Sequence, residues 1–63
     1  MKKTREYLAI VDTGTDYPEF SFYSDSRAGS KGNLADARRA MLSKWGNSAR
    51  NNKIVQVQLK DWQ

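Results

Sequence analysis

The chain has 63 residues, a net charge of +4, and neither cysteine nor histidine. That length predicts one small domain over residues 1–63 with a thin stability margin. Disulfides are excluded, and the usual zinc ligands, the commonest general base and the thiol nucleophile are all missing. We therefore expect a non-enzymatic binding protein that uses no metal and no cofactor.

Apolar runs in the chain are short. The run from Tyr7 to Val11 ends at Asp12 and is too short for the core of a signal peptide. No stretch approaches the roughly 20 apolar residues that cross a membrane. The lack of cysteine fits a reducing compartment. We expect a cytoplasmic protein with no membrane partner.

Two strands are predicted in the first part of the chain. Residues 6–11 are rich in β-branched and aromatic residues and end in a turn-forming cluster. Their nearly continuous apolar character predicts a central strand covered on both faces. In residues 19–24, Phe20 and Phe22 alternate with Ser21, which predicts a strand with one apolar face. The two strands are expected to form an antiparallel hairpin.

A helix is predicted over residues 34–45. Asn33 is the expected N-cap, Asp36 favours the positive end of the helix, and Gly46 suits the left-handed position after the last turn. Apolar residues recur at spacings of three and four, which predicts one stripe facing a core. The stripe consists of Leu34, Ala37, Met41 and Trp45.

The last predicted strand covers residues 53–60, where Val55, Val57 and Leu59 alternate with glutamines. The element order is then β-β-α-β. A right-handed crossover through the helix places the third strand beside the first. The predicted fold is α+β: a three-stranded antiparallel sheet of order 2-1-3 with one helix packed on one face.

This arrangement divides the apolar residues between a covered and an uncovered face of the sheet. The predicted core is Leu8, Ile10, Phe20, Phe22, Leu34, Ala37, Met41, Trp45, Val55, Val57 and Leu59. The uncovered face is expected to carry Tyr7, Ala9, Val11, Ser21, Tyr23, Ile54, Gln56 and Gln58. So apolar a face indicates an interaction site. Alternatively, the tyrosines flank the sheet and pack against the hairpin loop.

Positive charge is concentrated in the second part of the chain. Residues 1–25 carry three cations and five anions, whereas residues 26–63 carry eight cations and two anions. This asymmetry favours a polyanion partner, although a net charge of this size is also typical of soluble small domains. The loop over residues 24–33, with its glycines, Arg27 and Lys31, resembles an anion-binding turn before a helix. The alternative is a flexible, solvated connector.

Two functions follow, and the sequence leaves both open. The first is a nucleic-acid-binding accessory or regulatory protein that contacts phosphates through its basic helix and loop, with bases stacked on tyrosines. The second is a protein–protein interaction module, a homodimer or an inhibitor of a larger protein, that uses the apolar sheet face or an open strand edge. The residues predicted to bind nucleic acid are Arg27, Lys31, Arg38, Arg39, Arg50, Lys53, Tyr7 and Tyr23.

Overall fold

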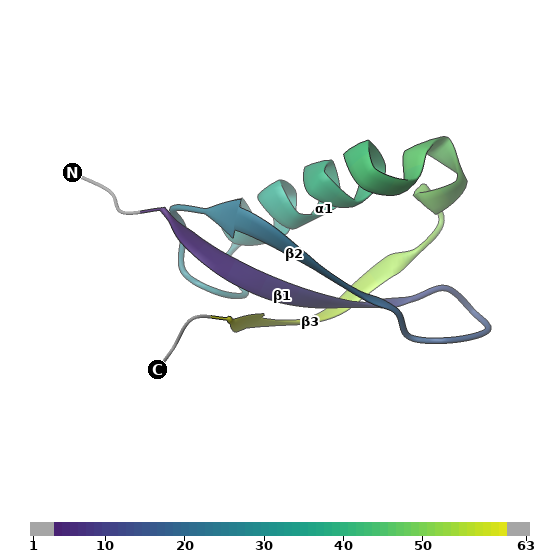
Figure 1. Cartoon of the computed structure of the whole chain (residues 1–63), viewed down its shortest axis with the longest axis horizontal. Coiled ribbons are helices and arrows are strands. Elements are labelled where there is room, and N and C mark those ends of the chain that lie inside the picture. Colours follow the sequence, from purple (N-terminus) through teal and green to yellow (C-terminus); the bar gives the residue numbers. More distant parts are fainter. Residues whose placement is uncertain (1–3, 61–63) are drawn as a thin grey trace.

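A computed structural model describes residues 4–60, and it confirms the predicted α+β fold (Figure 1). Three antiparallel strands form one open sheet of order β2-β1-β3, and one α-helix follows the second strand. The basic residues at positions 2 and 3 lie outside the described residues. The elements are β1 (Arg5–Asp12), β2 (Glu19–Ser24), α1 (Lys31–Trp45), the short 3-10 helix η1 (Gly46–Ala49) and β3 (Lys53–Leu59).

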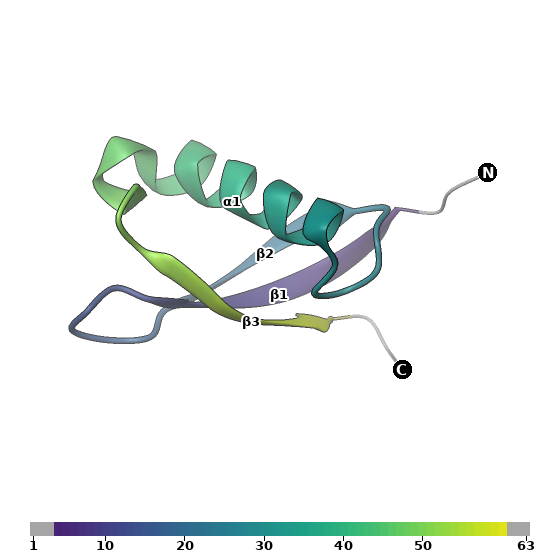
Figure 2. The ribbon, with the colours of Figure 1, turned by 180° about the vertical axis from the view of Figure 1, so that it is seen from behind.

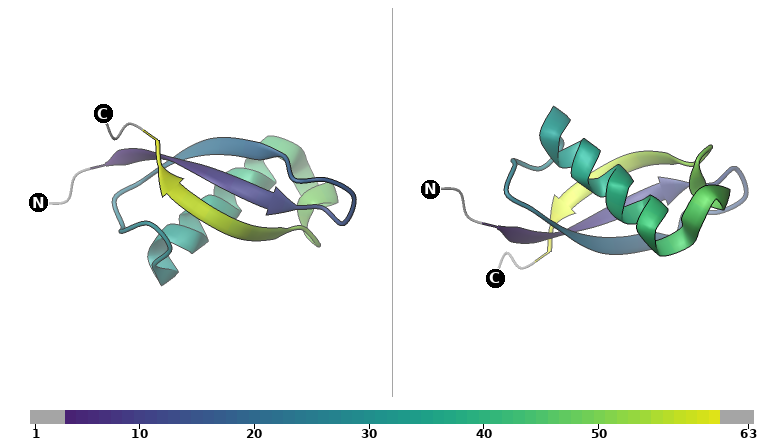
Figure 3. Two further views of the ribbon diagram at one scale, coloured as in Figure 1. Left: turned by 90° about the horizontal axis from the view of Figure 1, so that it is seen from below. Right: turned by 90° about the horizontal axis from the view of Figure 1, so that it is seen from above.

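The molecule has two layers. Helix α1 lies across one face of the sheet, and no element of the described chain covers the other face (Figures 1 and 2). The helix runs diagonally, so that its C-terminal half lies towards β2 while its N-terminus extends past β3 (Figure 3). Among residues 4–60, no helix is long and apolar enough to cross a membrane.

The assignment of the two faces of β1 was wrong. Tyr7 pairs with Phe22 and Ala9 with Phe20, and directly paired residues share one face of a sheet. Tyr7, Ala9 and Val11 therefore lie beneath the helix, where each is at most 5% exposed. Leu8 and Ile10, which were predicted in the core, are half-buried on the uncovered face. The hairpin register decides the face, because successive side chains of a strand alternate between the two faces.

An irregularity in β3 also changes the predicted faces. Val11 pairs with Ile54 but Ile10 pairs with Gln56, so Val55 has no counterpart on β1, as in a β-bulge. Ile54, predicted on the uncovered face, consequently lies on the helix side with Val57 and Leu59, all three half-buried. Val55, predicted in the core, is 53% exposed.

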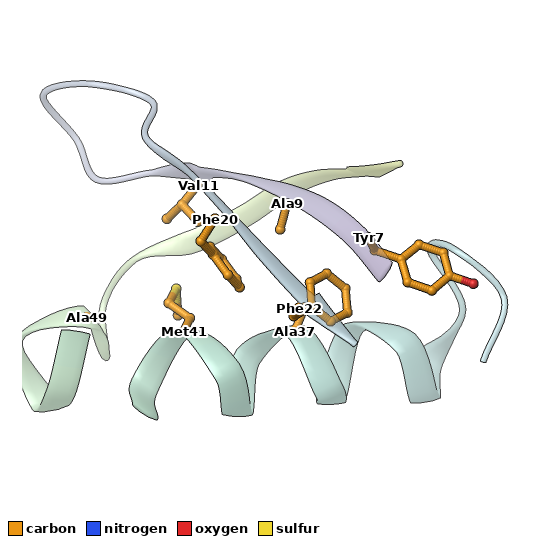
Figure 4. Packing of buried hydrophobic residues seen from close by; sticks show 8 residues of the cluster. All are labelled: Tyr7, Ala9, Val11, Phe20, Phe22, Ala37, Met41 and Ala49. Atoms are coloured by element: carbon orange, nitrogen blue, oxygen red, sulfur yellow. The ribbon is translucent and has the colours of Figure 1, made fainter. Parts of the chain in front are cut away.

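The core is small and centred on β1, β2 and the middle of α1 (Figure 4). Phe20, Phe22, Ala37 and Met41 are buried, as predicted. Trp45 is half-buried and packs edge-to-face on Phe20, with ring centroids 5.5 Å apart. Leu34 is 39% exposed and does not belong to the core. The cluster also contains Tyr7, Ala9, Val11 and, from η1, Ala49.

Helix α1 begins one turn earlier than predicted. Ser30 is the N-cap: its Oγ accepts a hydrogen bond from the Asn33 amide (3.2 Å). Asn33, expected at the cap, lies inside the first turn and is fully buried. The predicted helix end is confirmed, since Gly46 has φ +76° and its N–H reaches the Leu42 carbonyl.

Candidate nucleic-acid interface

Positive charge is concentrated in the helical layer, and negative charge in the hairpin loop and β2. The helical layer, residues 26–52, contains six cations and one anion. Residues 12–25, which include the hairpin loop and β2, contain four anions and no cation. Every cation of the helical layer is exposed. We call these six residues the basic layer: Arg27, Lys31, Arg38, Arg39, Lys44 and Arg50.

Arg38 and Arg50 meet where the chain returns from η1 towards β3. The Arg38 guanidinium donates a hydrogen bond to the Arg50 carbonyl (Nη2 to O, 2.9 Å). Because a guanidinium carries five N–H donors, most of its donors remain for a ligand. The contact holds the Arg38 head group in place, which lowers the entropy lost when it binds a planar anion.

On the other flank of the helix, Arg39 is tied to Asp36. Its Nη1 lies 3.0 Å from Asp36 Oδ1, and 77% of the Arg39 side chain is exposed. Asp36 also accepts a hydrogen bond from Ser24 Oγ (2.7 Å). This bond and the nearby guanidinium lower the pKa of Asp36 below its ordinary value, despite an opposing effect of partial desolvation. Asp36 thus offsets part of the charge of Arg39.

The loop between β2 and α1 is held by side chains. Asn33 Nδ2 and the Tyr7 hydroxyl both donate to the carbonyl of Ser26, at 3.3 and 2.9 Å. Asn33 Oδ1 accepts the Gly29 amide (3.1 Å). A buried polar network that is satisfied in this way makes a segment rigid. This supports a fixed loop over a flexible connector.

The same bonds limit what the loop can bind. The amides of Ser26, Gly29, Ser30 and Asn33 all donate to acceptors within the chain. These four amides are therefore not available for an anion. Arg27 and Lys31 remain exposed at its two ends. Arg38 is directed to the Arg50 carbonyl rather than back to the loop.

The other predicted site residues do not join the basic layer. Lys53 alternates with the inward-facing Ile54 and therefore projects from the opposite side of the sheet. Tyr7 is 5% exposed, and its ring is stacked on Phe22. Tyr23 is 68% exposed on the uncovered face, across the strand pair from Glu6. Five of the eight predicted residues thus lie in the helical layer, and Lys53 and both tyrosines do not.

Sequence reasoning missed one cation of this surface and the role of one buried residue that holds the loop beside it. Lys44, an exposed cation in the last turn of α1, is not among the residues predicted to bind nucleic acid. Asn33 was interpreted as a cap, although its position three residues after Ser30 also fits the first turn. In residues 4–60 no three Asp or Glu side chains cluster in a way that would hold a metal ion.

Comparison of the chain with protein-family models, curated proteins and solved structures finds no match.

Proposed function

We propose that this protein binds the phosphate backbone of nucleic acid through the basic layer. The observation that carries the proposal is the separation of charge: six exposed cations on the helical side against four anions and no cation in residues 12–25. Such a surface attracts a polyanion and orients it towards one side of the molecule. Its contacts are to phosphates, so they position the protein without reading the sequence.

The preferred ligand is a duplex. A platform for unpaired bases needs exposed aromatic rings beside the cations. Tyr7 is buried and Tyr23 lies on the uncovered face of the sheet. Since neither tyrosine can stack bases beside the basic layer, charge drives the binding. Double-stranded nucleic acid has a higher charge density than a single strand and is therefore preferred.

The test is a salt titration of binding to a short DNA duplex, followed by fluorescence anisotropy. We expect a dissociation constant of about 10⁻⁴ to 10⁻⁶ M at physiological salt and a linear fall of log affinity with log salt. Arg38→Gln with Arg39→Gln should reduce the slope by about two, because each lost phosphate contact removes about one.

A charge-matched control is available at the start of β1 and just after the end of β3. Arg5→Gln with Lys60→Gln also removes two positive charges, but from residues outside the basic layer. This control should retain most of the slope. Equal losses in the two variants would show that only net charge matters, and no binding at low salt would overturn the proposal. A strong preference for single strands would instead direct attention to Tyr23.

A further inference from the structure

Within residues 4–60, the backbone groups on the outer edge of β3 have no hydrogen-bond partner. The Lys60 amide donates to the Glu6 carbonyl (3.0 Å), which fixes the phase of the ladder between β3 and β1. In an antiparallel ladder, N–H and C=O groups point alternately towards and away from the neighbouring strand. Gln58 and Gln56 therefore point their backbone groups at β1, and Val57 and Leu59 point theirs outwards. Since β3 is an edge strand, this row can accept another strand.

Apolar side chains accompany this edge on the helix side. Val57 and Leu59 are only half-buried, and Leu34 of α1 is 39% exposed. Leu34 lies on the same flank of α1 as Arg38, whose guanidinium reaches the segment before β3. The N-terminal part of α1 extends beyond β3 in both views of Figure 3. A strand added to β3 would lie under this overhanging part of the helix.

The β2 edge differs in one decisive respect. Its outward backbone groups belong to Glu19, Ser21 and Tyr23, since the Val11 amide donates to Pro18. On the helix side, however, Phe20, Phe22 and Ser24 are already buried. An added strand would find backbone partners at β2 but little apolar surface. The edge of β3 offers both.

The occupant that fits is a single extended segment and not a second copy of this chain. Neighbouring strands lie about 4.8 Å apart, whereas packed helices need about 8–10 Å between their axes. Pairing β3 with β3 of another copy would bring a second helix to the same side of the extended sheet, beside the first. It would also place two basic layers side by side. A peptide without a helix of its own avoids both problems.

We propose that the edge of β3 binds an extended peptide by strand addition, with apolar residues at alternate positions and acidic residues at its ends. The apolar residues lie opposite Val57 and Leu59 and pack under Leu34, while backbone hydrogen bonds provide much of the affinity. The acidic residues complement Lys31, Arg38 and Arg50, the exposed cations on this flank. The inference does not depend on nucleic-acid binding.

The probe is an array of synthetic ten-residue peptides in which Val, Ile or Leu alternates with Thr between paired glutamates. We expect some members to bind well below 1 mM, an affinity of about −4 kcal/mol. Val57→Pro removes one outward N–H without removing a bond to β1, and proline is tolerated at such edge positions. It should weaken binding at least tenfold. Leu34→Ala should weaken it several-fold, and lysine in place of the glutamates should do the same.

The matched control is Ser21→Pro, which makes the same change at the edge of β2. It should leave peptide affinity unchanged, and circular dichroism would verify that both proline variants are folded. If Val57→Pro fails to fold, Leu34→Ala still decides the question, because its side chain is exposed. The proposal is overturned if no member binds at about 1 mM, or if binding survives Val57→Pro or Leu34→Ala unchanged. Both variants should bind the DNA duplex as the unmodified chain does, so the two proposals can fail separately.

Discussion

The two outer strands of the sheet are covered to very different extents. On the helix side of β2, Phe20, Phe22 and Ser24 are all buried, and Ser24 is bonded to Asp36 of the helix. On the same side of β3, Ile54, Val57 and Leu59 remain half-buried, and the bulge leaves Val55 53% exposed. One diagonal helix thus buries the side chains on its side of β2 and leaves those of β3 partly exposed.

This difference shows how a short chain can combine stability with an accessible surface. A single helix cannot fully cover three strands, so the apolar residues are concentrated where α1, β1 and β2 meet (Figure 4). Binding surfaces are generally drawn from the less stable parts of a structure. The incompletely covered side is also the side on which Arg38 and Arg50 lie. We infer that β2 supports the fold and that β3 and α1 are free to interact.

The largest expected effect contrasts Phe22→Ala with Val57→Ala. Phe22 is 3% exposed, so its truncation should cost about 3–5 kcal/mol of unfolding free energy, enough to unfold much of the protein at 25 °C. Val57 is half-buried, and its truncation should cost about 1 kcal/mol. Urea denaturation monitored by circular dichroism measures both. Similar losses in the two variants would contradict the unequal coverage.

An intermediate effect is expected from Asn33→Ala. The change leaves the Gly29 amide without its acceptor and removes one of two donors to the Ser26 carbonyl. We expect a loss of about 1–3 kcal/mol, the usual cost of an unsatisfied buried polar group. Amide hydrogen exchange should at the same time become faster in residues 26–30. Unchanged exchange there would mean that Asn33 does not hold the loop.

The smallest expected effect is a dependence of stability on pH through Asp36. The pKa of this carboxyl is lower in the folded protein than its ordinary value of 3.8, so the folded state favours the charged form. The resulting stability is present above that ordinary value and is lost as the pH falls through the lowered pKa. Urea midpoints measured from pH 6 to pH 2 should therefore fall less in Asp36→Asn than in the unmodified chain. Parallel curves would exclude a contribution of Asp36.

The sequence predicted the fold well because strong local patterns coincide with it. The alternation of Phe20 and Phe22, the glycine after Trp45 and the order of elements were sufficient for the topology. The faces of β1 could not be read in the same way. In the run from Tyr7 to Val11, the odd-numbered and the even-numbered residues are all apolar. Only the register with β2 therefore decides which of them face the helix.

The candidate site was harder to predict for related reasons. The cations are visible in the sequence, but the bulge decides that Lys53 projects away from the helix, and the hairpin register decides that Tyr7 is buried. The alternation of Val55 with Gln56 in the sequence does not predict the β-bulge at Val55. The rigidity of the loop depends on the buried side-chain amide of Asn33. From the sequence pattern alone, this residue is predicted only as a helix cap.

We propose that the helical side of the molecule, and not the uncovered sheet face, meets the nucleic acid. The most direct measurement is a two-dimensional ¹⁵N nuclear magnetic resonance titration of the chain with a short DNA duplex at low salt. We predict shifts confined to residues 26–52, with strands β1 and β2 and their hairpin loop unchanged. Shifts centred on Leu8, Ile10 and Tyr23, or no shifts at all, would contradict the account.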